Sequence, residues 1–219
     1  MTRELQPSRG PVVPLEPLLL ASASPRRQEI LRWAGIPFEA CPSDAEPEAR
    51  AGLGPAEYCQ WAAQAKAAEV ARRRPGRLVL GADTVVALGD SVLGKPEDEE
   101  AARAMLRRLS GRQHAVYTGL ALAVGPDLAC EVVEHERTLV TFADLTPDLV
   151  ERYVGSGDPL DKAGAYGIQS QGGELVIEVL GSYLNVVGLP LARLQAMLAR
   201  LGWTMWETDE NKAASRRTR

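Results

Sequence analysis

The sequence is poor in the residues that build disulfide frameworks, zinc sites and histidine-dependent active sites. Its 219 residues include three cysteines and two histidines. Cys41, Cys59 and Cys130 are far apart and form no C-x-x-C pair, so neither a zinc knuckle nor a redox dithiol is expected. Their odd number argues against a disulfide framework and fits a reducing cytosol. His114 and His135 fall in predicted strands without a nearby catalytic partner, so we expect both to be structural.

Several other common signals are also missing. No apolar run is long enough to cross a membrane, and the N-terminus has no secretory signal, so we expect a cytoplasmic protein without membrane contact. The G-x-x-x-x-G-K-[ST], G-x-G-x-x-G and H-E-x-x-H motifs are absent. The net charge of −4 argues against stable nucleic-acid binding, although local cations could still bind a nucleotide. Any metal would be held by oxygen ligands, which favours Mg²⁺ or Mn²⁺.

The pattern of the chain predicts one α/β domain between two polar ends. We expect a flexible leader over 1–16, the domain over 17–202 and a polar tail over 203–219. Strands interleaved with helices predict an α/β fold with a mixed sheet. The predicted strands cover 18–21, 78–82, 85–88, 91–93, 116–124, 129–142 and 175–180. The predicted helices cover 28–34, 55–74, 97–109, 147–154 and 190–201.

The motif SASPRR, at residues 22–27, is the most informative local feature. Ser24 is a good N-cap residue, and Pro25 is favoured at the first helical position. Arg26 and Arg27 then lie in the first turn, where the backbone N–H groups are already positive. Two cations there are explained by a bound anion such as phosphate. A capped surface helix with solvated arginines explains the same residues.

One aspartate and two lysines are further candidates. Asp83 follows the predicted strand LVLGA, a position typical of a metal ligand or general base, but also of a turn cap. Lys66 shares a helix face with small apolar residues, and Lys95 lies in an extended loop before a proline. Either lysine could bind phosphate, and either could be an ordinary surface lysine.

The segment 157–173 is rich in glycine and polar residues, as functional loops often are. It contains Gln169, whose amide can both donate to and accept from a nucleobase edge. A flexible connector is the alternative.

Six segments in order resemble the Maf family of nucleoside triphosphate pyrophosphatases, from about Leu18 to Leu201. They are SASPRRQEIL, GADTVV, LGKP, MLRRLSGRQHAVYTGLAL, DKAGAYGIQ and NVVGLPL. The resemblance implies a mixed sheet with flanking helices and two lobes around a cleft, a fold similar to that of inosine triphosphatase. It also implies hydrolysis of a nucleoside triphosphate to the monophosphate and pyrophosphate, with a divalent metal. Family members are often dimeric, so a homodimer is one option.

The resemblance also assigns roles to residues of this sequence. Asp83 matches the proton acceptor and is a candidate metal ligand. The phosphate-binding positions match Ser22, Arg26, Arg27, Lys66 and Lys95. The specificity positions of the subfamily acting on dTTP and UTP match Arg26, Thr84 and Gln169. The amide of Gln169 would pair with the O4 and N3–H edge that uracil and thymine share.

One segment departs from the family pattern, which usually has an acidic pair after the first helix. Here the segment reads CPSDAEPEAR, with Asp44, Glu46 and Glu48. Glu46 is taken as the second candidate metal ligand, and the choice among the three carboxylates stays open.

Two alternative functions also stay open. One is a pyrophosphatase that acts on 7-methyl-GTP or another modified nucleotide. The other is a non-catalytic nucleotide-binding regulator of cell division. The intact Asp83 favours an enzyme, and the intact GAYGIQ segment favours dTTP and UTP.

Overall fold

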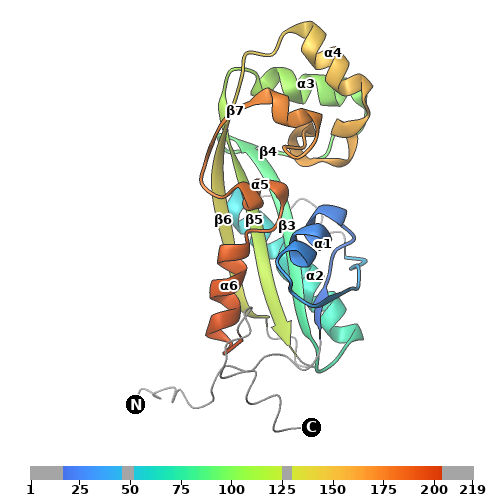
Figure 1. The fold of residues 1–219 in the computed structure, drawn as a ribbon, viewed down its shortest axis with the longest axis vertical. Helices are drawn as coiled ribbons and strands as arrows, with labels where there is room; N and C mark the ends of the chain where they lie inside the picture. Colours follow the sequence, from blue (N-terminus) through green and yellow to red (C-terminus); the bar gives the residue numbers. More distant parts are fainter. Residues whose placement is uncertain (1–16, 46–51, 125–129, 204–219) are drawn as a thin grey trace.

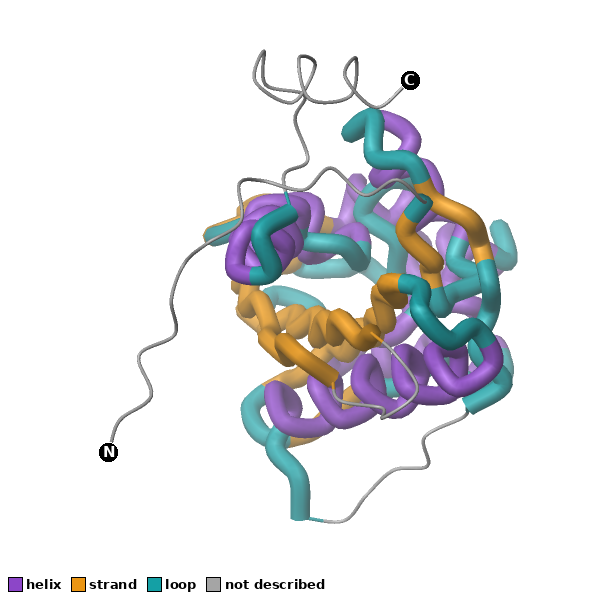
Figure 2. Tube along the Cα trace, turned by 90° about the horizontal axis from the view of Figure 1, so that it is seen from below, coloured by secondary structure: helices purple, strands orange, loops and turns teal. Residues whose placement is uncertain are grey.

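The computed structural model describes residues 17–45, 52–124 and 130–203. These residues form one mixed sheet of seven strands with helices on both faces (Figures 1 and 2). The strand order is β2-β1-β3-β5-β6-β7, and β4 pairs with β3 off this path. The strands are β1 (Leu18–Leu20), β2 (Phe38–Ala40), β3 (Leu78–Leu88), β4 (Ser91–Leu93), β5 (Gln113–Val124), β6 (Cys130–Phe142) and β7 (Val176–Leu180). The predicted α/β class with a mixed sheet is therefore confirmed.

The helices divide the molecule into two lobes along the sheet (Figure 1). The lower lobe contains α1 (Pro25–Trp33), α2 (Pro55–Arg73), α5 (Tyr183–Val187) and α6 (Leu191–Arg200). The upper lobe contains α3 (Glu99–Leu109), α4 (Pro147–Gly155) and the short 3₁₀ helices η1 (Asp158–Asp161), η2 (Ala163–Ala165) and η3 (Gln171–Leu175). None of the described helices combines the length and the apolar character needed to cross a bilayer.

In the lower lobe, the two faces of the sheet differ in the size of their side chains. On β5, Leu120 and Leu122 belong to the cluster around α6, whereas Ala121 and Ala123 pack with α2. This alternation follows from the two-residue period of a strand. A separate apolar cluster fills the upper lobe around α3 and α4. Each lobe thus has its own core, and the central strands connect the two cores.

Two glycines let α2 lie directly on the sheet. A Cβ atom on Gly81 of β3 would stand 2.1 Å from the carbonyl oxygen of Ala63, and one on Gly119 of β5 would stand 2.1 Å from that of Cys59. Both oxygens belong to the backbone of α2, so no side-chain movement relieves the clash. This close approach brings the polar residues of α2 to those of β3.

Strand β3 has a free stretch of edge between its two partners. Near its start it pairs with β1, through Val79 and Leu80, and near its end it pairs with β4, from Val86 onward. Within the described residues, 81–85 have no strand partner on that edge. Polar groups on this stretch are therefore available to a ligand.

The structure corrects several sequence-based expectations. Residues 78–88 form one continuous strand, so Asp83 lies in the middle of a strand and not at its end. The site opens at the gap between β1 and β4 instead. Strand β2 and helix α5 were not predicted, because each is very short. In the segment 157–173, for which a flexible connector was the alternative to a functional loop, the chain forms two 3₁₀ helices and begins a third. The leader, and the tail after Trp203, lie outside the described residues.

Candidate active site

A cleft of about 530 Å³ opens between the lobes at the free edge of β3. This volume is within the usual range for small-molecule sites. Apart from Asp44, every predicted site residue that the structure describes lines the cleft, namely Ser22, Arg26, Arg27, Lys66, Asp83, Thr84, Lys95 and Gln169. Glu46 and Glu48 lie outside the described residues. Asp44 is exposed, does not line the cleft, and pairs with Arg73.

Arg27 is buried beneath the cleft. Its Nε donates to the carbonyl oxygen of Gly188 at 2.9 Å, one terminal nitrogen donates to Ser22 Oγ at 2.9 Å, and the other to Thr84 Oγ1 at 3.1 Å. Burial lowers the pKa of Arg27, and the charge of Asp83 opposes that shift. A buried cation gains when an anion approaches, since the anion replaces lost hydration. Arg27 thus orients the neighbouring hydroxyl groups and makes this end of the cleft positive.

The polarity of Ser22 suits an anion. Its Oγ accepts from Arg27 at 2.9 Å and from the backbone N–H of Ser24 at 3.2 Å. A serine hydroxyl has two acceptor sites and one proton, so only the proton remains for a ligand. Ser24 begins α1 without a side-chain capping bond, and Pro25 occupies the first turn as expected.

Lys66 and Asp83 form an ion pair in the cleft. Lys66 Nζ lies 2.5 Å from Asp83 Oδ1, and their side chains are 22% and 18% exposed. Because residues alternate along β3, Asp83 faces α2, which the two glycines hold close to the sheet. Tyr58, one helical turn from Ala62 on α2, also lines the cleft. Partial burial raises the pKa of Tyr58, and the charge of Asp83 raises it further.

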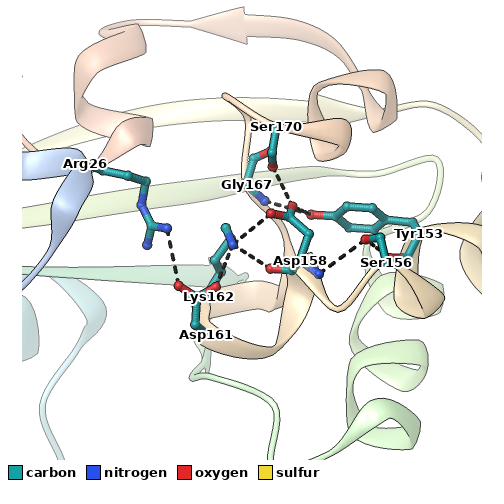
Figure 3. A network of polar contacts seen from close by, with 8 residues as sticks. All are labelled: Arg26, Tyr153, Ser156, Asp158, Asp161, Lys162, Gly167 and Ser170. Carbon is teal, nitrogen blue, oxygen red and sulfur yellow. Dashed lines mark hydrogen bonds and ion pairs between the residues drawn. The ribbon is translucent and has the colours of Figure 1, made fainter. Parts of the chain in front are cut away.

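The opposite wall of the cleft is a network of ion pairs in segment 158–170 (Figure 3). Lys162 Nζ lies 2.6 Å from Asp161 Oδ1 and 3.0 Å from Asp158 Oδ1. Asp158 also accepts from Tyr153 at 2.7 Å and from Ser170 at 2.5 Å. Arg26 reaches across from α1 to Asp161 at 3.6 Å, so one ion pair joins the two lobes.

A buried aromatic cluster supports this wall. His114 Nε2 on β5 lies 2.9 Å from the hydroxyl oxygen of Tyr166, and both rings meet Phe142 edge-on. Burial lowers the pKa of His114 to about 4, which a contact with the backbone of Arg112 opposes in part. Tyr166 lines the cleft three positions before Gln169. The neutral imidazole therefore connects the sheet to the segment that carries Gln169.

A magnesium ion would fit this cleft only if a substrate and water supplied most of its ligands. Within the described ranges, no three His, Cys, Asp or Glu side chains cluster closely enough to form a protein cage for a metal. Magnesium does not require such a cage, because it commonly binds one or two carboxylates, substrate phosphates and waters. Asp83 could supply the protein ligand.

Sequence reasoning assigned no role to four contributors to the cleft and its support. Lys162, Tyr58 and Tyr166 line the cleft, and Thr118 lies behind Thr84. Lys162 stood in the DKAGAYGIQ segment, whose polar density pointed to it. Thr118 had no signal of its own, because a buried threonine in a strand is ordinary.

The fold and the site together define a two-lobed α/β protein with a cleft lined by several arginines and lysines. Residues 17–201 match the Maf-like protein family, and the chain belongs to this family. It is 47% identical over 192 residues to the dTTP/UTP pyrophosphatase of Symbiobacterium thermophilum, covering 88% of this chain and 97% of the relative. It is 51% identical over 189 residues to the dTTP/UTP pyrophosphatase of Moorella thermoacetica, covering 86% and 97%. Among solved structures, a HAM1 protein from Coxiella burnetii aligns with 84% of this chain and 98% of its own, with 15% identity and a TM-score of 0.49.

Proposed function

We propose that this protein hydrolyses UTP and dTTP to the nucleoside monophosphate and pyrophosphate. The observation that carries the proposal is the Lys66–Asp83 pair, which lies in a cleft that also holds Arg26, Arg27 and Lys95. A phosphoanhydride substrate needs such cations to neutralise its charge, and its hydrolysis needs a base. The relatives from Symbiobacterium and Moorella carry the name of this activity over nearly the whole domain.

The proposed phosphate site combines groups from both lobes. Ser22 donates a hydrogen bond from its hydroxyl group. Arg26, Lys66 and Lys95 contribute charge-assisted hydrogen bonds. Arg27 orients Ser22 and adds positive charge from below. The triphosphate would also compete with Asp161 for Arg26, because a phosphate carries more charge than one exposed carboxylate.

Asp83 is the proposed general base. It takes a proton from the water that attacks the anhydride between the α- and β-phosphates, and pyrophosphate leaves as that bond breaks. Lys66 holds the Asp83 carboxylate in place and neutralises charge that develops on the phosphates. A divalent cation, when bound by Asp83 and the phosphates, would further neutralise that charge.

Thr84 and Gln169 are the proposed base-reading residues. Uracil and thymine present a carbonyl and an N–H on the edge where cytosine presents the reversed pattern. A cytosine bound there would leave polar groups unpaired. The methyl group that separates thymine from uracil gives little discrimination, so both should be accepted.

The proposal includes a cytoplasmic location, where nucleotides are held. It also includes a homodimer.

The proposal is tested by incubating the purified protein with Mg²⁺ and UTP, dTTP, CTP or 7-methyl-GTP. We expect pyrophosphate from UTP and dTTP and much less from CTP. Asp83→Asn should retain the melting temperature and lose on the order of 10² to 10⁴ in rate, as when a general base is removed. A preference for 7-methyl-GTP, or release of single phosphates, would overturn the substrate assignment. Nucleotide binding without turnover would favour the regulator instead.

A further inference from the structure

Behind the cleft, a chain of hydrogen bonds runs from Arg27 into the interior. Arg27 donates to Thr84 Oγ1 at 3.1 Å, and Thr84 Oγ1 lies 3.0 Å from Thr118 Oγ1 on the paired strand β5. The hydroxyl of Thr118 donates to the backbone carbonyl oxygen of Asn185 at 3.0 Å. Thr118 and Asn185 are both 0% exposed, so water cannot replace either partner. All members of this hydrogen-bond chain therefore contact one another within the protein, and of its two threonines Thr84 is the one that lines the cleft.

The two ends of this chain fix the direction of every proton in it. A guanidinium group only donates, and a backbone carbonyl only accepts. Because the proton of Thr118 is committed to Asn185, Thr118 can only accept from Thr84. The proton of Thr84 is therefore committed to Thr118. Turning it toward the cleft would leave the Thr118 oxygen without this donor in a buried environment.

The carbonyl at the far end is itself held in place. The side-chain amide of Asn185 donates to the carbonyl oxygen of Val116 at 3.0 Å and to Thr138 Oγ1 at 2.9 Å. The backbone N–H of Asn185 donates to Ser182 Oγ at 3.2 Å. These contacts join α5 to β5 and β6, so the acceptor that orients Thr118 cannot easily rotate away.

The remaining capacity of Thr84 is one lone pair. A threonine hydroxyl has two acceptor sites, and Arg27 occupies one of them. No other contact within the described residues uses the second site, and Thr84 lines the cleft, so this site is left for a ligand. Ser22, on the other side of Arg27, is the reverse case, because both of its lone pairs are used and its proton is left. Arg27 thus separates a group that only donates, which suits a phosphate, from a group that only accepts, which suits an N–H.

We propose that Thr118 is a specificity-determining positioning residue, which commits the Thr84 hydroxyl to accept the N3–H of uracil or thymine. This inference rests on the proposed pyrophosphatase function. The sheet surface next to Thr84 is apolar, since Val86 and Val116 form the next cross-strand pair on the same face and both line the cleft. A planar base fits beside such a wall with its polar edge toward Thr84.

The fixed hydroxyl supplies what Gln169 cannot supply alone. Gln169 is exposed, and its amide can turn to present either the oxygen or the nitrogen. It therefore fits the edge of uracil or of cytosine. Cytosine has no proton on N3, so its N3 lone pair would face the lone pair of Thr84. Thr84 discriminates because Thr118 holds its proton, and Gln169 is left to donate to the O4 carbonyl.

The test compares kcat/KM for UTP and CTP in three threonine variants. Thr118→Val removes the acceptor for the Thr84 proton, so that proton can turn toward cytosine N3. We expect the UTP-to-CTP ratio to fall about tenfold, the value of one modest hydrogen bond. Thr118→Ser keeps the hydroxyl and should keep the ratio. Thr141→Val is the control, because Thr141 is a threonine of β6 whose hydroxyl contacts Gln113 and Glu178 and no member of this hydrogen-bond chain. It should leave the ratio unchanged.

A measurement on the unaltered protein complements the variants, in case Thr118→Val does not fold. N3-methyl-UTP has no N3 proton, so it should be rejected at least as strongly as CTP. Turnover of N3-methyl-UTP equal to that of UTP, or an unchanged ratio in a folded Thr118→Val, would overturn the assignment. If the unaltered protein releases no pyrophosphate from UTP, the proposed function fails, whereas activity with an unchanged ratio rejects only the role of Thr118.

Discussion

Two adjacent arginines show how differently the two sides of the cleft are built. Arg27 is buried, and each of its three nitrogens donates to an atom of the protein. Arg26 is 32% exposed in its side chain and has one long ion pair, to the mostly exposed Asp161. The floor of the cleft, made by Arg27 and its partners, is therefore a buried hydrogen-bond network. The wall, made by segment 158–170, contains ion pairs that are partly in water.

The difference predicts a division of labour. Buried hydrogen bonds are directional and costly to break, so the floor can hold protons in fixed positions. Exposed ion pairs contribute little and exchange readily with other charges. A triphosphate can therefore displace contacts of the wall while the floor keeps its geometry. The floor is suited to read the substrate, and the wall is suited to yield to it.

The largest effect on the free energy of unfolding should come from acidification, which protonates His114 and so disrupts its buried contact with Tyr166. The folded-state pKa of His114 is about 4, below its usual 6.5, because burial disfavours the imidazolium. Between these values the unfolded chain binds a proton at this position and the folded chain does not. The free energy of unfolding is therefore not reduced by this group above pH 6.5. It falls as the pH drops toward 4, by on the order of 3 kcal/mol. Urea unfolding at several pH values would measure this.

A histidine control isolates that contribution. His114→Gln should flatten the dependence of the unfolding free energy on pH between 6.5 and 4, at some loss of stability at pH 7. His135→Gln, on the neighbouring strand β6 and partly exposed, should keep the dependence of the unaltered protein. Equal pH dependence in His114→Gln and the unaltered protein would show that other groups cause the acid sensitivity.

The next effect tests the comparison directly, by removing each arginine in turn. Arg27→Ala deletes three buried donors, so we expect the free energy of unfolding to fall by roughly 1.5 to 3 kcal/mol. Its kcat/KM should fall for UTP and dTTP alike, because Ser22 loses its orientation. Arg26→Ala should lower kcat/KM but leave the unfolding free energy within about 0.5 kcal/mol. Similar losses of stability in both variants would contradict the distinction between floor and wall.

The sequence predicted the chemical groups of the site better than their support. Arg26 was identified because a cation in the first turn of a helix is explained by a bound anion. Ser22 and Asp83 were assigned roles by the resemblance to the Maf family, in which they match motif positions. Lys66 was ambiguous, since its pairing with Asp83 depends on how closely α2 approaches the sheet. Gly81 and Gly119 permit that approach, but a glycine in a strand pattern does not reveal which backbone comes near it. Thr118 depends on a cross-strand register that local patterns do not specify.

The predicted position of Asp83, at the end of a strand, was wrong for a similar reason. The strand was expected to end at Ala82, but Thr84, Val85 and Val86 continue it, since β-branched residues favour extended backbone. What opens the site is a change of neighbour, from β1 to β4, along one edge of β3. Which strands lie beside each other is a property of the whole fold, so local sequence could not supply it.

The smallest effect should come from Asp161, the acid that joins the lobes. Partial burial raises its pKa, but the hydrogen bond and charge of Lys162, with the charge of Arg26, lower it by more, so Asp161 carries charge at neutral pH. It then competes with phosphate for both cations. Asp161→Asn should lower KM for UTP by a few-fold at most, since an exposed pair contributes about 0.2 to 1 kcal/mol. The gain should shrink as salt is raised, because salt screens exposed charges, and kcat should stay unchanged.

Asp158→Asn is the contrasting variant: Asp158 also accepts from Tyr153 and Ser170, so its loss should loosen the wall and raise KM. If Asp161→Asn also raised KM, Asp161 would be a structural part of the wall and not a competitor that the substrate displaces.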